Sequence, residues 1–76
     1  MTAILYHINS AQCKTIKQKL LDCKISFKEE TDINRIIENQ IEQVPCLVLN
    51  EEKLLYFQAL EKLLKIKKGE NNDYSN

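Results

Sequence analysis

The sequence lacks most features of fibrous, linker, membrane and nucleic-acid-binding chains. Its 76 residues include one glycine and one proline, which excludes collagen-like and proline-rich classes. No apolar run approaches the roughly 20 residues that span a bilayer. Eleven basic and eleven acidic residues cancel, and a net charge of zero offers no electrostatic footprint for nucleic acid or an anionic membrane. We therefore expect neither nucleic acid nor a membrane among its partners.

Cysteine is also scarce. Cys13, Cys23 and Cys46 are too few and too scattered for a disulfide framework, and their spacing to the single histidine fits no zinc pattern. The first strand-like segment begins almost at Met1, without the charged region and cleavage site of a signal peptide. We therefore expect a cytoplasmic protein without a metal, in a reducing compartment where cysteines stay outside structural disulfides.

The chain has the length and composition of one small globular domain. Seventy-six residues leave no room for a second domain, and 43% apolar with 29% charged residues is ordinary for a soluble globule. Gly69 is expected to end the last helix, and the residues after it are polar. We therefore predict a domain at residues 1–68 and a flexible polar tail at residues 69–76.

Hydrophobic periodicity predicts seven elements in the order β-α-β-α-β-β-α. Helical segments show apolar residues three and four apart, as in Cys13, Ile16 and Leu20. The expected strands cover residues 3–8, 25–29, 44–49 and 53–57, and the expected helices cover residues 11–23, 33–41 and 60–68. The first β-α-β requires a parallel pair with a right-handed crossover, whereas the short turn at residues 50–52 requires a hairpin. The pattern predicts an α/β fold with a four-stranded mixed sheet and helices on both faces.

Three stretches, at residues 6–13, 43–45 and 54–60, are similar to motifs of a known family. They resemble the glutaredoxin-like family, which has the minimal thioredoxin fold. The family's Cys-x-x-Cys loop is similar to Tyr6-His7-Ile8-Asn9-Ser10-Ala11-Gln12-Cys13. Its cis-proline motif is similar to Gln43-Val44-Pro45, and its Ile-Gly-Gly-Phe-Asp-Asp-Leu segment to Leu54-Leu55-Tyr56-Phe57-Gln58-Ala59-Leu60. The resemblance covers about residues 3–66 and is closest to the glutaredoxin-like redoxins that serve ribonucleotide reductase. It implies the minimal thioredoxin fold, a cis Val44–Pro45 bond and thiol-disulfide exchange.

The sequence departs from that family at its reactive positions. Ser10 replaces the attacking cysteine, and a hydroxyl cannot form a disulfide. Cys13 stands at the resolving position. Leu55 and Tyr56 replace the glycine pair that lets the backbone of glutathione approach. We therefore expect no cofactor, glutathione included.

Each candidate residue has two interpretations. Cys13 lies in the first turn of a helix, where a thiolate is stabilised, but it also fits a buried apolar stripe. Cys46 follows Pro45 and could pair with Cys13, or strand alternation could turn it into the core. Ser10 suits a helix N-cap, and His7 suits a partly buried strand residue.

Two functions stay open at this stage. The first is weak or atypical thiol-disulfide exchange at a degenerate Ser-x-x-Cys site, with Cys13 and Cys46 as catalytic candidates. The second is a redox-inactive module for a peptide or partner protein, because in the family the backbone at the position of Val44 pairs with the ligand's main chain. Its expected binding residues are Ser10, Gln12, Val44, Pro45 and Tyr56. We expect a monomer or a weak homodimer, the latter through an apolar edge strand at residues 54–57.

Overall fold

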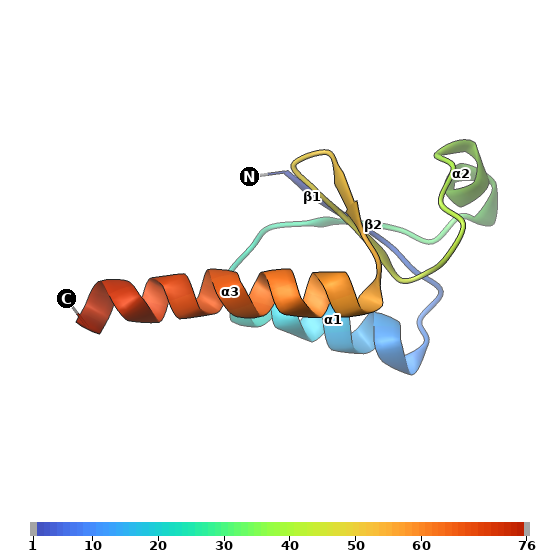
Figure 1. The fold of residues 1–76 in the computed structure, drawn as a ribbon. Helices are drawn as coiled ribbons and strands as arrows, with labels where there is room; N and C mark the ends of the chain where they lie inside the picture. The colour runs from blue at the N-terminus through green and yellow to red at the C-terminus, as the bar shows by residue number, and fades with distance from the viewer. Residues whose placement is uncertain (1, 76) are drawn as a thin grey trace.

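The order of elements in the computed structural model is the one that the periodicity predicts (Figure 1). The structure describes the backbone of residues 2–75 and the side chains of residues 2–67. The elements are β1 (Ala3–Tyr6), α1 (Ala11–Asp22), β2 (Lys28–Glu30), α2 (Ile33–Glu38), β3 (Cys46–Leu49), β4 (Glu52–Leu54) and α3 (Tyr56–Ser75). Among the described residues, no helix is long and apolar enough to cross a membrane.

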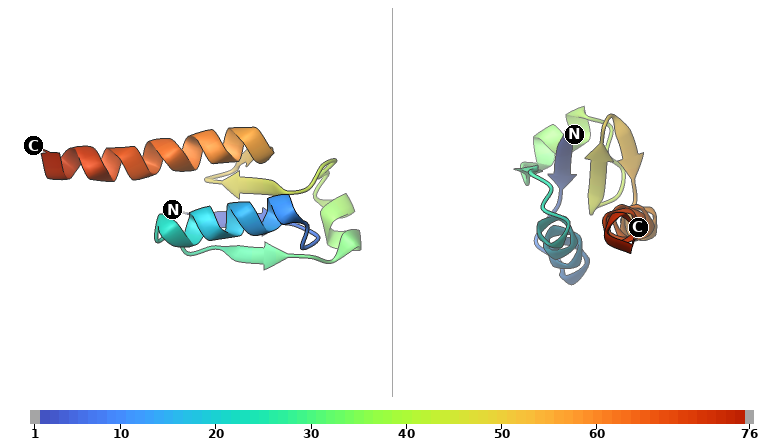
Figure 2. Two further views of the ribbon diagram at one scale, coloured as in Figure 1. Left: turned by 90° about the horizontal axis from the view of Figure 1, so that it is seen from below. Right: turned by 90° about the vertical axis from the view of Figure 1, so that its left-hand side faces the viewer.

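The strands of the described chain form one four-stranded mixed sheet in the order β2-β1-β3-β4. β1 pairs with β2 in parallel, as the crossover requires. β3 runs antiparallel to both β1 and β4. Figure 2 shows α1 and α3 side by side on one face of the sheet and α2 on the other. The predicted α/β fold with a mixed sheet and helices on both faces is confirmed.

The two faces of the sheet bury separate apolar clusters. Under α1 and α3, the main cluster contains Leu5, Ile16 and Leu63. Under α2, a smaller cluster contains Tyr6 and Ile36. Strand β3 serves both clusters because successive side chains of a strand point to opposite faces. Its Leu47 and Leu49 belong to the main cluster, and Cys46 and Val48 belong to the smaller one.

The second strand and the second helix are shorter than predicted. The chain leaves α1 through Lys24, which has a φ of 58°, and Ile25 N–H still bonds to the Leu20 carbonyl at 3.0 Å. The strand therefore begins only at Lys28. α2 ends at Glu38. On the isoleucine face expected over residues 33–41, Ile36 is buried, whereas Ile33 and Ile37 are exposed.

The fourth strand ends earlier than predicted, because a helix cap interrupts the apolar run at residues 54–57. Leu55 N–H donates to Gln58 Oε1 at 3.0 Å, the arrangement in which the third helical residue reaches back to the N-cap. α3 therefore begins at Tyr56. The expected apolar edge strand is wrong, since β4 is Glu52–Leu54 and two of its three residues are charged.

α3 begins before and extends beyond the predicted 60–68. Its backbone stays helical through Gly69 to Ser75, so glycine does not end the helix there. A glycine inside a helix costs about 1 kcal/mol relative to alanine, which neighbouring residues can offset. The predicted flexibility of residues 69–76 stays a prediction, because their side chains and all of residue 76 lie outside the described residues.

Candidate functional site

Three segments meet at the end of the sheet where β1 finishes (Figure 1). They are the loop at residues 7–10, the turn at residues 43–45 and the first turn of α3. A hollow of about 370 Å³ lies between the first turn of α1, the turn at residues 43–45 and the first turn of α3. Gln12 and Gln43 are in its lining. These are the segments that the sequence resemblance indicates, so the candidate site is built there.

Ser10 caps α1 and also contacts Cys13. Its hydroxyl oxygen accepts from Cys13 N–H at 3.3 Å, which satisfies one of the unpaired amides at a helix start. Its O–H donates to Cys13 Sγ at 3.1 Å. The predicted N-cap is confirmed. Cys13 is 1% exposed, so in this conformation a disulfide partner has no path to its sulfur.

The structure does not bring Cys13 and Cys46 together. Cys46 lies in the cluster under α2, beside Tyr6. Cys13 belongs to the buried stripe of α1 that continues through Ile16, and α1 covers the opposite face. Burial raises the pKa of the Cys46 thiol, although Lys53 and a backbone N–H partly oppose the shift. Strand alternation therefore makes Cys46 a core residue, and no disulfide joins cysteines in the described chain.

A buried histidine anchors the loop before α1. His7 Nδ1 accepts from the backbone N–H of Asn9 at 3.2 Å. An N–H can only donate, so Nδ1 carries no proton and Nε2–H donates to Glu29 Oε1 at 2.9 Å. Lys17 Nζ lies 3.1 Å from the same oxygen. This chain of contacts ties the loop to β2 and α1, with Asn9 held at a φ of 62°.

The sequence analysis missed the pairing of His7 with Glu29. The predicted parallel pairing of the first two strands carries part of the signal. Tyr6 lies opposite Glu30, so the residue after β1 meets the carboxyl end of β2.

The Glu29 contacts predict a dependence of stability on pH. The Lys17 ammonium lowers the pKa of Glu29 below its ordinary value of 4.5, with His7 adding to the effect and burial opposing it. A carboxyl whose pKa is lower in the folded state stabilises the fold above its unfolded pKa and loses this contribution as pH falls through its folded pKa. We expect Glu29→Gln to cost about 0.5–1 kcal/mol at pH 7 and much less at pH 3.

Urea unfolding at the two pH values measures this difference. Glu42→Gln is the matched control, because Glu42 is exposed and no salt bridge to another described residue involves it. An equal loss for Glu29→Gln at pH 7 and pH 3 would contradict the electrostatic explanation.

Two shallow hollows flank the turn at residues 43–45. One is the 370 Å³ hollow, whose lining includes Tyr56 and Phe57. The other, of about 310 Å³, includes Cys46 and Lys53. Gln43 and Gln58 line both. Neutral amides and aromatic rings dominate the first hollow, which suits an uncharged, partly apolar ligand.

An exposed aromatic residue stands at the rim of this hollow. Phe57 is 77% exposed, and its ring meets the ring of Tyr56 edge to face with centroids 5.1 Å apart. Large exposed apolar side chains beside a hollow are typical of interaction sites. The sequence analysis did not name Phe57, because it was expected inside a strand.

The main chain of Val44 is available at the same place. The Val44–Pro45 peptide bond is cis, and Pro45 itself is buried. Among residues 2–75, no other group hydrogen-bonds to the backbone N–H or C=O of Val44. Of the predicted binding residues, Gln12 and Tyr56 line the hollow, whereas Ser10, Val44 and Pro45 lie beside it rather than in its wall.

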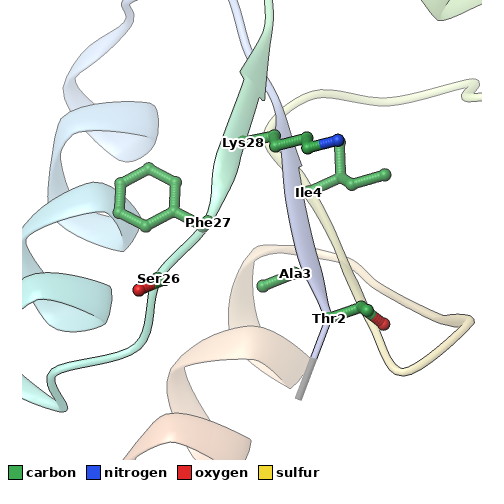
Figure 3. Close-up of a pocket in the computed structure, with 6 residues that line it drawn as sticks. All are labelled: Thr2, Ala3, Ile4, Ser26, Phe27 and Lys28. Carbon is green, nitrogen blue, oxygen red and sulfur yellow. The ribbon is translucent and has the colours of Figure 1, made fainter.

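A further hollow, of about 330 Å³, lies at the opposite end of the sheet, where β1 and β2 begin (Figure 3). Phe27 and Ser26 point to one side of the strands, whereas Ile4 and Lys28 point to the other. The side chains that line this hollow therefore do not converge on one ligand position. In the part of the chain that the structure describes, no group of histidine, cysteine and acidic residues could hold a metal ion.

Comparison of the chain with family models, curated proteins and solved structures finds no match. What the fold and the site define is a small α/β protein with an aromatic hollow beside a partly buried serine–cysteine pair.

Proposed function

We propose that this chain is a redox-inactive member of the glutaredoxin-like group, with the minimal thioredoxin fold, and that it binds an extended peptide segment of a cytoplasmic partner protein. The observation that carries the proposal is the aromatic hollow next to the unpaired main chain of Val44. The element order and the parallel β1–β2 pair beside an antiparallel hairpin support the fold assignment. The three stretches of sequence resemblance support the group.

The two parts of the site suit the two parts of an extended peptide. Main-chain groups of such a ligand can pair with the N–H and C=O of Val44, and this supplies affinity that is independent of sequence. A neighbouring side chain of the ligand can enter the hollow against Tyr56 and Phe57. Amide groups of Gln12 and Gln43 can then hydrogen-bond to the peptide without requiring a charge.

The same geometry argues against thiol exchange as the main activity. The position that would attack a disulfide holds Ser10, whose hydroxyl is engaged as a helix cap and as a donor to Cys13. Cys13 is buried, and burial raises the pKa of Cys46. The thiolate is the reactive form, so these surroundings disfavour exchange.

The binding proposal is tested by NMR titration of ¹⁵N-labelled protein with a pool of capped hexapeptides that have phenylalanine, leucine or valine fixed at one position. We expect shift changes at the backbone amides of Gln12, Gln43, Val44 and Phe57. Removing a well-placed aromatic anchor costs more than 1 kcal/mol at a typical hot spot, so Phe57→Ala should weaken binding at least about fivefold.

The matched control is Leu21→Ala, since Leu21 is also exposed but lies on α1. It should bind as the wild type does. Absence of binding from every pool, or equal binding by Phe57→Ala, would overturn the proposal.

One observation favours atypical thiol-disulfide exchange as a second candidate. Cys13 Sγ lies at the start of α1 and receives the Ser10 O–H at 3.1 Å. A helix N-terminus and a hydroxyl donor both stabilise a thiolate once it forms. This candidate requires an opening motion that exposes Cys13, which native-state labelling can detect.

A further inference from the structure

The zero net charge conceals a difference in charge between the helices on the two faces of the sheet. In the layer of α1 and α3, residues 11–24 and 56–67 carry seven lysines against two acidic residues. The α2 segment, residues 31–42, carries three acidic residues against one arginine. α2 lies on the opposite face of the sheet (Figure 2), so the layer of α1 and α3 is called the basic side here and the α2 segment the acidic side.

The basic side contains a large hollow. A groove of about 500 Å³ runs between α1 and α3, with Leu60, Leu63 and Leu64 in its wall. Lys19, Lys67 and Asp22 also line it, and neither lysine makes a salt bridge within the described residues. An apolar groove with two ammonium groups against one carboxylate suits an apolar ligand flanked by carboxylates.

The acidic side presents a surface of that kind. Ile33 and Ile37 are 59% and 65% exposed although they are large and apolar. They lie four residues apart on α2, which places them on one face of the helix. Asp32 and Glu38 border them in the sequence. Neither isoleucine of this acid-flanked pair belongs to an apolar cluster of the described residues.

We propose that copies of this chain associate head to tail, with α2 of one copy in the groove between α1 and α3 of the next. Ile33 and Ile37 are four residues apart on α2, and Leu60 and Leu64 are four residues apart on α3. Side-chain rows of this spacing pack into one another at helix contacts. Carboxylates beside the isoleucines then approach Lys19 and Lys67.

The arrangement is heterologous, because each copy uses two different surfaces. The two surfaces lie on opposite faces of the sheet, so a dimer leaves one groove and one α2 surface unoccupied. Further copies can therefore add to the dimer. The groove is small compared with a standard protein interface, so the contact is weak and transient. Its charges lie at a solvent-exposed rim, so salt weakens it. This association involves neither the peptide hollow nor any thiol.

Sedimentation velocity of the full chain, from about 10 µM to about 1 mM, measures this association. We expect the mean mass to rise with concentration beyond twice that of the monomer at low salt, and to fall at about 0.5 M NaCl. Ile37→Lys disrupts the isoleucine pair of α2, and Leu64→Glu disrupts the wall of the groove. Each variant alone should stay monomeric, and an equimolar mixture of the two should form a 1:1 dimer and nothing larger.

Leu21→Glu is the matched control for Leu64→Glu. Both leucines are more than half exposed, but Leu21 is absent from the groove, so this variant should associate as the wild type does. Circular dichroism establishes that each variant is folded. A wild-type chain that stays monomeric at about 1 mM, association unchanged in Ile37→Lys, or variants that fail to pair would overturn the proposal.

Discussion

Ser10→Cys is expected to introduce a disulfide into a chain that forms none. Ser10 Oγ lies 3.1 Å from Cys13 Sγ, and a disulfide requires about 2.05 Å between sulfurs, so a shift of about 1 Å suffices. With oxidised glutathione in excess, the thiol at position 10 exchanges first, and Cys13 then displaces glutathione. Two protein thiols become a disulfide as one glutathione disulfide becomes two thiols, and the protein mass falls by about 2 Da.

Mass spectrometry before and after oxidation measures the change. The wild type and Ser10→Ala should keep their reduced mass under the same conditions. Ser10→Cys combined with Cys13→Ser is the matched control, since its single thiol at this site can only form a mixed disulfide with glutathione. A Ser10→Cys chain that stops at the mixed disulfide would contradict the orientation of Ser10 toward Cys13.

Leu63→Ala is expected to remove a large part of the stability of the fold. Leu63 is 1% exposed and packs in the main cluster under the sheet with Leu5 and Ile16. Truncating a buried leucine costs about 2–5 kcal/mol because it leaves a cavity. At about 0.05–0.15 kcal/mol per residue, a chain of this length has a free energy of unfolding of about 4–11 kcal/mol. Thermal or urea unfolding, followed by circular dichroism, measures the loss.

The next residue supplies a matched control. Leu64 is 53% exposed on the same helix, so Leu64→Ala removes the same atoms from a site near solvent. Its cost in dilute solution should stay within about 0.5 kcal/mol. Equal losses from the two variants would show that α3 does not pack against the sheet through Leu63.

The sequence predicts the architecture better than the boundaries of its elements. Spacing alone predicts the element order, the mixed sheet and the buried stripe of α1 at Cys13, Ile16 and Leu20. It fails where local hydrogen bonds decide. The side chain of Gln58 caps Leu55 and turns an apolar run that resembles a strand into the start of a helix.

The candidate site is predictable in part, for a similar reason. The sequence resemblance indicates the end of the molecule where the 370 Å³ hollow lies and names Gln12 and Tyr56, which line it. It cannot reveal Phe57, whose exposure depends on where α3 starts. Nor can it decide which way Cys46 points, because a strand buried on both faces has no polar alternation to fix the register.

The central claim is that this end of the molecule is a binding surface and not a centre of thiol exchange. Its most direct test is the rate at which native protein reacts with iodoacetamide between pH 5 and pH 9, resolved by peptide mass spectrometry. We expect Cys13 and Cys46 to react no faster than the chain unfolds, because both are buried. Labelling of Cys13 below pH 7, much faster than unfolding, would reveal an accessible, stabilised thiolate and would contradict the claim.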